Sequence, residues 1–322
     1  MIGRRAFVTA LGASVVVGAS AQATRRPRIV WLSLDPAEAN GGFRAFQKGL
    51  RELGYVDGRD ITIETVLFDV APEDQKRLAA GVVQSRPAII VTQGPVVRAI
   101  RATGTTIPVV FGFSGDPIVA GLVKSLARPG TNYTGVSFLS LDLVGKRMEM
   151  LREIVPGLRR VAIIANPDHP GELSEKAVSS DAAKRLGLVV DYFPVSTPEQ
   201  LEEALAGTRK AGSGAILLFP DAGMMRNAAR IAEFGRQQRI PAISGWAIFA
   251  RRGNVASYGP ILEVGYGRLS WYVDRILKGT PPAELPVELP TKVEFVINAS
   301  AARDIQLTIP AAVMLRADEV IQ

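Results

Sequence analysis

Short apolar runs recur along the first half of the chain, separated by longer stretches in which apolar residues follow a helical spacing. The runs are rich in β-branched and aliphatic residues, as buried strands are, and lie at 28–34, 61–66, 88–92 and 108–113. Helices are predicted between them, at 40–53, at 72–84 and from Gly94-Pro95 onward. Because strand and helix alternate, the pattern predicts parallel βα units whose loops meet at one edge of a sheet.

The second half of the chain repeats this plan. Strands are predicted at 160–165, 188–195, 215–219 and 240–243, with helices between them. In both halves a helix ending in Leu-Gly precedes a strand, a helix opened by Pro-Glu follows, and a later strand opens with Ile-Pro. Two similar α/β lobes explain this shared order better than one large sheet does, and 322 residues are many for a single core.

The last part of the chain breaks the alternation. A strand, a helix, a proline-rich extended segment and a final strand are predicted at 255–258, 263–277, 279–290 and 293–297. The expected lobes are residues 28–134 with 259–290, and residues 135–258 with 291–322. The fold class is therefore α/β, with two similar doubly wound parallel-sheet lobes. Three connections between the lobes would form a hinge that opens and closes a ligand cleft between them.

The segment 107–137 contains the central feature of the sequence, a predicted strand followed by a polar loop. Its apolar strand leads into a loop that contains Ser114 and Asp116. Asp116-Pro117 predicts a helix start, because Asp is a good N-cap and Pro is tolerated in the first turn. Arg128-Pro129-Gly130 predicts the end of that helix, and residues 131–137 are expected to be an extended crossing segment.

Residues 1–23 have the features of an export signal. Arg4-Arg5 precedes an apolar stretch at 6–18, which is too short to span a bilayer comfortably. Small residues at 19–21 and 21–23 offer cleavage sites, so a periplasmic location is expected. The arginine pair fits the twin-arginine route and an ordinary Sec signal equally well. No cysteine follows the apolar stretch, which excludes a lipoprotein anchor.

Composition removes several classes of chemistry. The chain has no cysteine, which excludes disulfides and cysteine-based metal or nucleophile sites. A single histidine, His169, is too few for the usual zinc ligand sets, so neither a metal nor another cofactor is expected. The net charge of +7 is scattered along the chain in pairs such as Arg251-Arg252 rather than clustered. Such pairs are typical of solvated faces, so no nucleic-acid partner is expected.

Candidate binding residues follow from the expected sheets, because ligands of open α/β sheets bind at the carboxyl ends of strands. In lobe 1 these positions are Leu34, Asn40, Gln93, Gly94, Ser114 and Asp116. In lobe 2 they are Asn166, Asp168, Asp221, Trp246 and Tyr258. All would face the cleft, the usual place for a small-molecule pocket.

Some of these positions suggest specific contacts. Helix starts near Gly41-Gly42 and Gly94-Pro95 could hold a ligand carboxylate through backbone amides, or be ordinary helix starts. Asp116 and Asp221 could hold a ligand ammonium, and Asp116 could equally serve as an N-cap. Trp246 could form an aromatic wall for a planar ligand or pack beneath a loop.

An enzyme is the alternative. His169, Asp168 and Ser114 could be assembled into a hydrolase on paper. The spacing around Ser114 is not that of a nucleophile elbow, and adjacent Asp168 and His169 would point in different directions in an extended loop. No glycine-rich nucleotide motif is present either.

Several segments, in order along the chain, carry a resemblance. They are Gly49-Leu50 with Glu52-Leu53-Gly54-Tyr55, Ile107-Pro108-Val109-Val110, Asp116-Pro117, Gly121-Leu122-Val123, Arg128-Pro129-Gly130, Asn132 with Thr134-Gly135-Val136, Leu277-Lys278-Gly279, Leu307-Thr308-Ile309-Pro310 and Arg316-Ala317-Asp318-Glu319-Val320-Ile321. Together they resemble the tryptophan/tyrosine-type family of ABC importer substrate-binding proteins, which have the type I periplasmic binding protein fold.

The resemblance implies a monomeric exported protein that closes on a small molecule and delivers it to an ABC permease without catalysis. It implies an amino-acid-like ligand, with aromatic ones as candidates. It supports the loops after Leu32, Val91, Phe111, Ala165, Leu218 and Ile243 as ligand-lining. Gln93-Gly94-Pro95 and His169 depart from the family pattern, which leaves the ligand's identity open.

Overall fold

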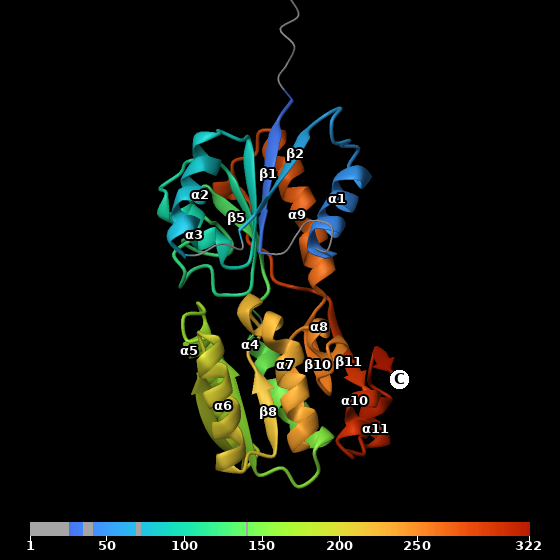
Figure 1. Ribbon diagram of the computed structural model, residues 1–322. Helices are drawn as coiled ribbons and strands as arrows, with labels where there is room; N and C mark the ends of the chain where they lie inside the picture. Colours follow the sequence, from blue (N-terminus) through green and yellow to red (C-terminus); the bar gives the residue numbers. More distant parts are fainter. Residues whose placement is uncertain (1–25, 35–40, 69–71, 140) are drawn as a thin grey trace, which may run out of the picture.

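The computed structural model describes residues 26–34, 41–68, 72–139 and 141–322, and they form two α/β lobes, one above the other in Figure 1. The expected signal segment and Asn40 lie outside the described residues. Each lobe has its own sheet, with strand orders β2-β1-β3-β4-β5 and β12-β11-β10-β9-β8-β6-β7. The predicted fold class is confirmed.

Lobe 1 is built on a fully parallel sheet. Its strands are β1 (Arg28–Ser33), β2 (Thr62–Leu67), β3 (Ile89–Gln93), β4 (Val109–Phe113) and β5 (Tyr133–Ser137). Its helices are α1 (Gly41–Glu52), α2 (Pro72–Gln84), α3 (Val96–Ala102) and, from late in the chain, α9 (Leu262–Leu277).

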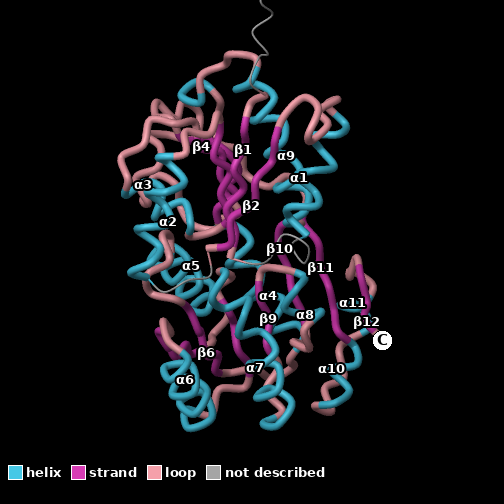
Figure 2. The backbone as a smooth tube through the Cα atoms, turned by 45° about the horizontal axis from the view of Figure 1, so that its top comes forward, coloured by secondary structure: helices cyan, strands magenta, loops and turns pink. Residues whose placement is uncertain are grey.

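Successive side chains of a strand point to opposite faces of the sheet, so alternate residues of the lobe 1 strands pack into two separate cores. Ile29 and Trp31 of β1 face α1 and α9, whereas Val30 and Leu32 face α2 and α3. Helices α1 and α9 lie side by side on the first face (Figure 2). A Cβ atom on Gly49 of α1 would lie only 2.3 Å from the hydroxyl oxygen of Ser270 on α9, so glycine permits this close approach.

Lobe 2 repeats the strand order of lobe 1 and extends it. Its strands are β6 (Arg160–Ala165), β7 (Val189–Pro194), β8 (Ala215–Leu218), β9 (Ala242–Ser244), β10 (Ala256–Pro260), β11 (Val293–Asn298) and β12 (Glu319–Ile321). The order β7-β6-β8-β9-β10 matches β2-β1-β3-β4-β5 strand for strand. Only the β10–β11 pair is antiparallel among the described strands.

Helices cover both faces of the lobe 2 sheet. They are α4 (Leu141–Ile154), α5 (Glu172–Arg185), α6 (Pro198–Ala211), α7 (Ala222–Gln238), α8 (Ala247–Arg251), α10 (Ala299–Asp304) and α11 (Ala311–Met314). One core joins α4, α5 and the C-terminal helices to the sheet, and the other joins α6, α7 and α8 to its opposite face.

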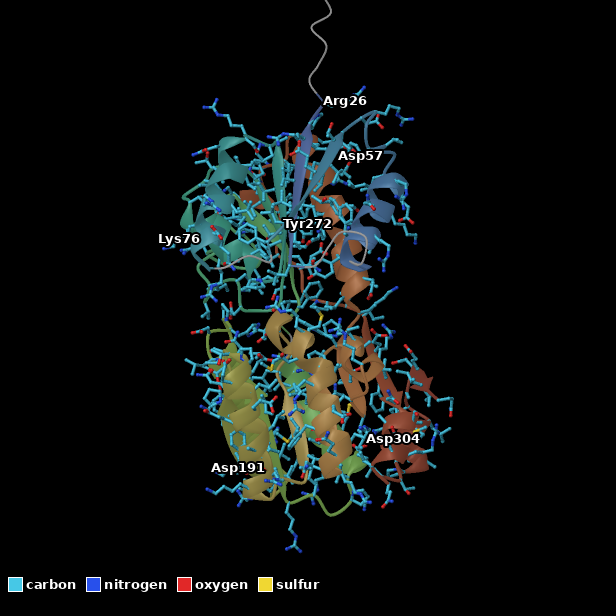
Figure 3. The ribbon with its side chains drawn as sticks, in the orientation of Figure 1. Arg26, Asp57, Lys76, Asp191, Tyr272 and Asp304 are labelled. Atoms are coloured by element: carbon cyan, nitrogen blue, oxygen red, sulfur yellow. The ribbon has the colours of Figure 1, made fainter. Side chains whose placement is uncertain are left out.

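The chain passes between the two sheets three times, after β5, after β10 and before β11. Two of the expected boundaries fall inside strands. Residues 135–137 pair with β4 and so belong to the first sheet, and residues 259–260 pair with β11 in the second. Tyr272 of α9 lies in lobe 1 (Figure 3), and its hydroxyl donates to the carbonyl oxygen of Pro286 at 2.7 Å, which ties the returning segment to this lobe.

The helix predicted from Asp116-Pro117 does not form, and this prediction was wrong. Asp116 does accept hydrogen bonds from the amides of Ile118 and Val119, at 2.7 and 3.1 Å. The turn ends at Gly121, whose φ of +66° is left-handed, and the chain then buries Leu122 in the core instead of continuing a helix. The cap was read correctly, but the left-handed glycine ended the turn.

Candidate functional site

A cavity of about 250 Å³ lies between the lobes, at the carboxyl ends of strands from both sheets. This is where open α/β sheets place their ligands. Lobe 1 and the crossing segments contribute Leu34, Gly41, Gly42, Gln93, Gly94, Ser114, Phe138, Leu262, Glu263 and Tyr266, and lobe 2 contributes Ala222, Met225, Trp246, Ile248 and Arg252. A ligand here would therefore touch both lobes at once.

The N-terminal ends of three helices lie in the wall of this cavity. Gly41 and Gly42 are the first residues of α1, Gly94 directly precedes the start of α3, and Ala222 is the first residue of α7. The unsatisfied amides and the helix dipoles make such ends favourable for negative charge. The Asp221 carboxylate already caps α7, so the ends that favour an anionic group are those of α1 and α3 in lobe 1.

Aromatic side chains form much of the remaining wall. The rings of Phe138 and Tyr266 lie 5.0 Å apart, centroid to centroid. Tyr266 fits directly over backbone, because a Cβ atom on Gly42 or Gly112 would come within 2.6 or 2.3 Å of its ring. Trp246 lines the cavity from lobe 2 and is 5% exposed. The two interpretations of Trp246 therefore coexist, since it lines the cavity and packs in the core.

Two charged side chains line the cavity within the described part of the chain, and they have opposite signs. Arg252 follows α8 in lobe 2, and its Nη1 donates to the carbonyl oxygen of Met225 at 2.6 Å. Glu263 lies in the first turn of α9, on the lobe 1 side. Within the described residues no ion pair holds either side chain. Each lobe thus contributes one unpaired charge to the cavity.

The two lobes touch beside the cavity through the loop between β6 and α5. Ser114 Oγ of lobe 1 lies 3.1 Å from Nε2 of His169 of lobe 2. The amide of Asp116 donates to the carbonyl oxygen of Pro170 at 2.8 Å, and Nη1 of Arg98 donates to the carbonyl oxygen of Asp168 at 2.9 Å. Ser114 therefore belongs both to the cavity wall and to the contact between lobes.

A group of buried ionisable side chains lies behind His169. Burial raises the pKa of Glu175 to about 8, although the positive charge of Arg147 lowers it. Burial likewise lowers the pKa of Arg147 to about 10, with Glu175 acting in the opposite direction, so desolvation dominates on both sides of the pair. Burial also raises the pKa of Asp221. The cost of burying these charges therefore exceeds their mutual attraction.

Five of the predicted contact residues line the cavity, namely Leu34, Gln93, Gly94, Ser114 and Trp246. The others that are described lie elsewhere. Asp221 caps α7, accepting a hydrogen bond from the amide of Met224 at 2.9 Å, and Tyr258 packs edge-on against Phe295. Asp116, Asn166 and Asp168 belong to the turns around the lobe contact. Whether any of these residues contacts a ligand stays a prediction.

The residues that sequence reasoning missed lie off the strand ends. They are Phe138, Met225, Ile248, Arg252, Leu262, Glu263 and Tyr266. Most of them sit on helices or on crossing segments, which reach the cavity only through the packing of the lobes. The aromatic residues and glycines on α9 were a visible signal, but nothing local indicated which way that helix faces.

The geometry does not favour the hydrolase alternative. Asp168 contributes only its backbone carbonyl near His169, and its carboxylate lies toward Ser196. The nearest carboxylate to Nδ1 of His169 is that of Glu175, at 3.7 Å, which is beyond hydrogen-bond distance. Burial lowers the pKa of His169 to about 4, which makes it a weak general base. Within the described residues, no group of three or more metal-ligating side chains occurs.

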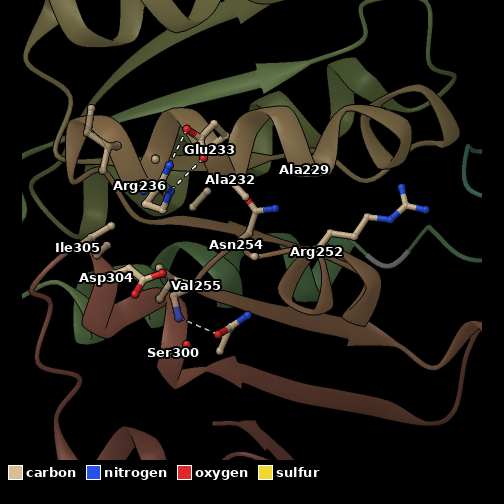
Figure 4. A pocket seen from close by; sticks show the side chains of 16 residues that line it. Ala229, Ala232, Glu233, Arg236, Arg252, Asn254, Val255, Ser300, Asp304 and Ile305 are labelled. Carbon is tan, nitrogen blue, oxygen red and sulfur yellow. Dashed lines mark hydrogen bonds and ion pairs between the residues drawn. The ribbon is translucent and has the colours of Figure 1, made fainter.

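Another cavity, of about 320 Å³, lies within lobe 2 between α7 and α10 (Figure 4). Its polar side chains are engaged inside the lobe: Arg236 pairs with Glu233, and Nδ2 of Asn254 donates to the carbonyl oxygens of Ala228 and Phe249. This cavity is lined by lobe 2 alone, so closure of one lobe on the other would not enclose a ligand bound in it.

A two-lobed α/β fold with a cavity at the facing strand ends defines a bilobed solute-binding protein. The chain belongs to the ABC transporter substrate binding protein family, whose model matches residues 36–321. A tyrosine-binding protein of Clostridioides difficile (strain R20291) is 26% identical over 282 residues, covering 85% of this chain and 78% of that protein.

Solved structures show the same fold. A domain from Streptococcus pneumonia in complex with L-Trp has a TM-score of 0.84 and 21% identity, covering 92% of this chain and 100% of that one. A conserved domain protein from Vibrio cholerae O1 has a TM-score of 0.84 and 25% identity, covering 92% and 99%. Membership of the family makes the chain a substrate-binding protein with a solute-binding role in ABC transport.

Proposed function

We propose that this protein binds an amino-acid-like solute, with aromatic amino acids as the first candidates, and delivers it to the permease of an ABC importer. The observation that carries the proposal is the interlobe cavity, which combines helix N-termini, an aromatic wall and two unpaired charges of opposite sign. Relatives named for tyrosine and bound to tryptophan support the same ligand class.

Each part of an aromatic amino acid has a matching group in the cavity. Its carboxylate suits the helix amides and the guanidinium of Arg252, which can form charge-assisted hydrogen bonds. Its ammonium suits the carboxylate of Glu263. Its ring suits the wall of Phe138, Tyr266 and Trp246, where stacked or edge-on contacts add to simple burial. The opposite charges sit on opposite lobes, so the zwitterion would draw the lobes together.

The proposed movement is hinge closure. The lobes would be residues 28–137 with 261–290 and residues 141–260 with 291–322, joined by the three crossing segments. Several short connections limit the motion to one axis, as in other domain closures around ligands. Catalysis plays no part in this function, and the solute would be released unchanged.

Export and assembly complete the proposal. The arginine pair and apolar stretch of residues 1–23 support export to the periplasm with cleavage near residues 21–23. A monomer is expected to dock on its permease. In the part of the chain that the structure describes, no helix is both long and apolar enough to cross a membrane.

The test removes one charge at a time from the protein and from the solute. Wild type, Arg252→Gln and Glu263→Gln are titrated with L-tyrosine, with tyramine, which lacks the carboxylate, and with 4-hydroxyphenylpropionate, which lacks the ammonium. Arg252→Gln should weaken L-tyrosine binding about tenfold to a hundredfold and leave tyramine binding unchanged. Glu263→Gln should do the same for L-tyrosine while sparing 4-hydroxyphenylpropionate. Equal losses for all three solutes in either variant would contradict the assignment.

A further inference from the structure

His169 is the only histidine in the sequence, and it sits where the two lobes meet. It belongs to the loop between β6 and α5 of lobe 2, and its Nε2 lies 3.1 Å from Oγ of Ser114 in lobe 1. Ser114 is part of the wall of the interlobe cavity. An imidazole from one lobe thus holds a cavity-lining hydroxyl of the other.

The surroundings of His169 are made by both lobes. Its chain neighbours Asp168 and Pro170 accept hydrogen bonds from Arg98 and from the Asp116 amide of lobe 1. Three successive residues of this loop therefore contact lobe 1. If the lobes separate, His169 loses Ser114 and the nearby Arg98 together, and its ring becomes open to water.

Glu175 faces the other side of the ring, with Oε2 at 3.7 Å from Nδ1. Three further charged groups act on Glu175, namely Arg147 of α4, Glu172 of α5 and Asp221 at the start of α7. All of them belong to lobe 2, so opening of the cleft leaves the surroundings of Glu175 unchanged. Of the charged groups that act on His169 and Glu175, Arg98 is the one on the opposite lobe, so opening moves it away from His169.

We propose that His169 is a positioning residue of the binding site, which in its neutral form orients the Ser114 hydroxyl and joins the lobes, so that protonation of His169 weakens solute binding. This inference rests on the proposed function of the cavity. It goes further, because it assigns a role to a residue outside the cavity wall and couples closure to pH.

The chemistry of the ring supports a neutral form in the closed state. Burial, assisted by the positive charge of Arg98, lowers the pKa of His169 to about 4, whereas burial raises the pKa of Glu175 to about 8. At neutral pH both groups are then uncharged. Glu175 lies 3.7 Å from Nδ1, which is too far to act as its hydrogen-bond partner. In the neutral ring Nε2 can therefore accept the Ser114 hydroxyl hydrogen, and protonation of the ring removes this acceptor.

The direction of the pH effect follows from linkage. In the open form His169 should titrate near the ordinary value of 6.5, and in the closed form near 4. Affinity is therefore complete above pH 6.5 and falls as the pH drops toward 4. Between pH 7.5 and pH 5 the dissociation constant should rise roughly 10- to 30-fold. L-Tyrosine and L-tryptophan do not titrate in this window, so they are suitable probes.

The decisive experiment is a proton NMR titration of untagged protein, where the single histidine gives one resolved ring signal. Saturation with L-tyrosine should lower the pKa of His169 by more than one unit, and calorimetry on the same samples should show the rise in dissociation constant. The same pKa with and without L-tyrosine, or an affinity that does not change between pH 7.5 and pH 5, would overturn the proposal.

Two variants test whether His169 acts by positioning Ser114 or only by packing between the lobes. His169→Gln keeps a side-chain donor but cannot titrate, so its affinity should be independent of pH. Ser114→Ala leaves burial and Arg98 in place, so the pKa of His169 should still fall on binding, whereas the affinity at pH 7.5 should be lower than that of wild type because the bond between the lobes is lost. If L-tyrosine and L-tryptophan fail to bind at any pH, the proposed cargo is wrong. In that case the distance between the lobes is measured without solute. If this distance does not increase on acidification, the role of His169 is wrong as well.

Discussion

Glu175 is a carboxyl group whose burial changes the stability of the protein with pH. It is 2% exposed, and burial raises its pKa from 4.5 to about 8. The folded protein therefore holds a proton there that the unfolded chain loses first. The stability contribution is complete below pH 4.5 and is lost as the pH rises through 8.

The substitution Glu175→Gln should flatten this dependence. At pH 8 the variant should have a free energy of unfolding higher than wild type by on the order of 2 kcal/mol, with little difference at pH 4.5. Denaturant unfolding at both pH values measures the difference. Glu203→Gln, on the exposed face of α6, is the matched control and should follow wild type. A Glu175→Gln profile parallel to that of wild type would contradict the assigned pKa.

Trp246 and Phe249 make a matched pair for testing the aromatic wall. Both are buried in the same core, with ring centroids 6.3 Å apart, but only Trp246 lines the cavity. Trp246→Leu and Phe249→Leu should each lower the free energy of unfolding by roughly 1–3 kcal/mol. Only Trp246→Leu should also weaken L-tyrosine binding, by about tenfold or more. Calorimetry decides, and equal affinities in the two variants would remove Trp246 from the site.

The sequence predicted the cavity residues that lie at or just after the ends of strands. Gln93 is the last residue of β3 and Ser114 directly follows β4, and the rule for parallel sheets places such positions at the cavity. Arg252 and Glu263 were not predicted, because their position depends on how α8 and α9 pack across the cleft. The pair Arg251-Arg252 was interpreted as a solvated face, and both residues are exposed, but Arg252 also lines the cavity.

At the scale of elements, helices α1 and α9 of lobe 1 approach so closely that their contact requires glycine. A Cβ atom on Gly49 would lie 2.3 Å from Ser270 Oγ and 2.8 Å from the carbonyl oxygen of Gly267, whereas one on Gly81 of α2 would meet nothing within 4 Å. Both glycines lie inside helices, so alanine gains about 1 kcal/mol of helix propensity at each. The difference between the two substitutions isolates the packing clash.

Gly81→Ala should therefore stabilise the protein by up to about 1 kcal/mol, and Gly49→Ala should destabilise it by roughly 1–3 kcal/mol. Thermal and denaturant unfolding of the two variants against wild type gives both values. If Gly49→Ala were as stable as Gly81→Ala, the close approach of α1 and α9 would be contradicted.

Most elements could be predicted because their signals are local. Strands such as β3 and β8 are short apolar runs, and the Thr197–Gln200 capping box marks the start of α6. The missing helix after Asp116 shows the limit of local signals. Its cap was readable, but burial of Leu122 and the left-handed Gly121 decided the conformation.

At the scale of the whole molecule, the repeated strand order was predictable from the repeated order of motifs in the two halves. The exact boundaries between the lobes were harder to predict. Strands β5 and β10 continue past the residues at which the chain was expected to cross to the other lobe. A crossing point depends on pairing between strands that are distant in sequence, and no local pattern encodes it.

Closure of the lobes can be measured directly because the chain contains no cysteine. Lys76→Cys and Asp304→Cys place labels on exposed positions of different lobes (Figure 3). Saturating L-tyrosine should change the distance between the labels and narrow its distribution, as hinge closure requires. A control pair within lobe 1, Lys76→Cys with Asp57→Cys, should give the same distance with and without solute. An unchanged distance between the lobes would contradict closure.

The central claim is that a small solute binds between the two lobes. A crystal structure of the protein grown with L-tyrosine tests it most directly. The account predicts a tyrosine in the interlobe cavity, with its carboxylate toward the helix N-termini and Arg252 and its ring against Trp246 and Tyr266. A solute bound in the lobe 2 cavity between α7 and α10, or a cavity left empty at a concentration that saturates binding in solution, would contradict it.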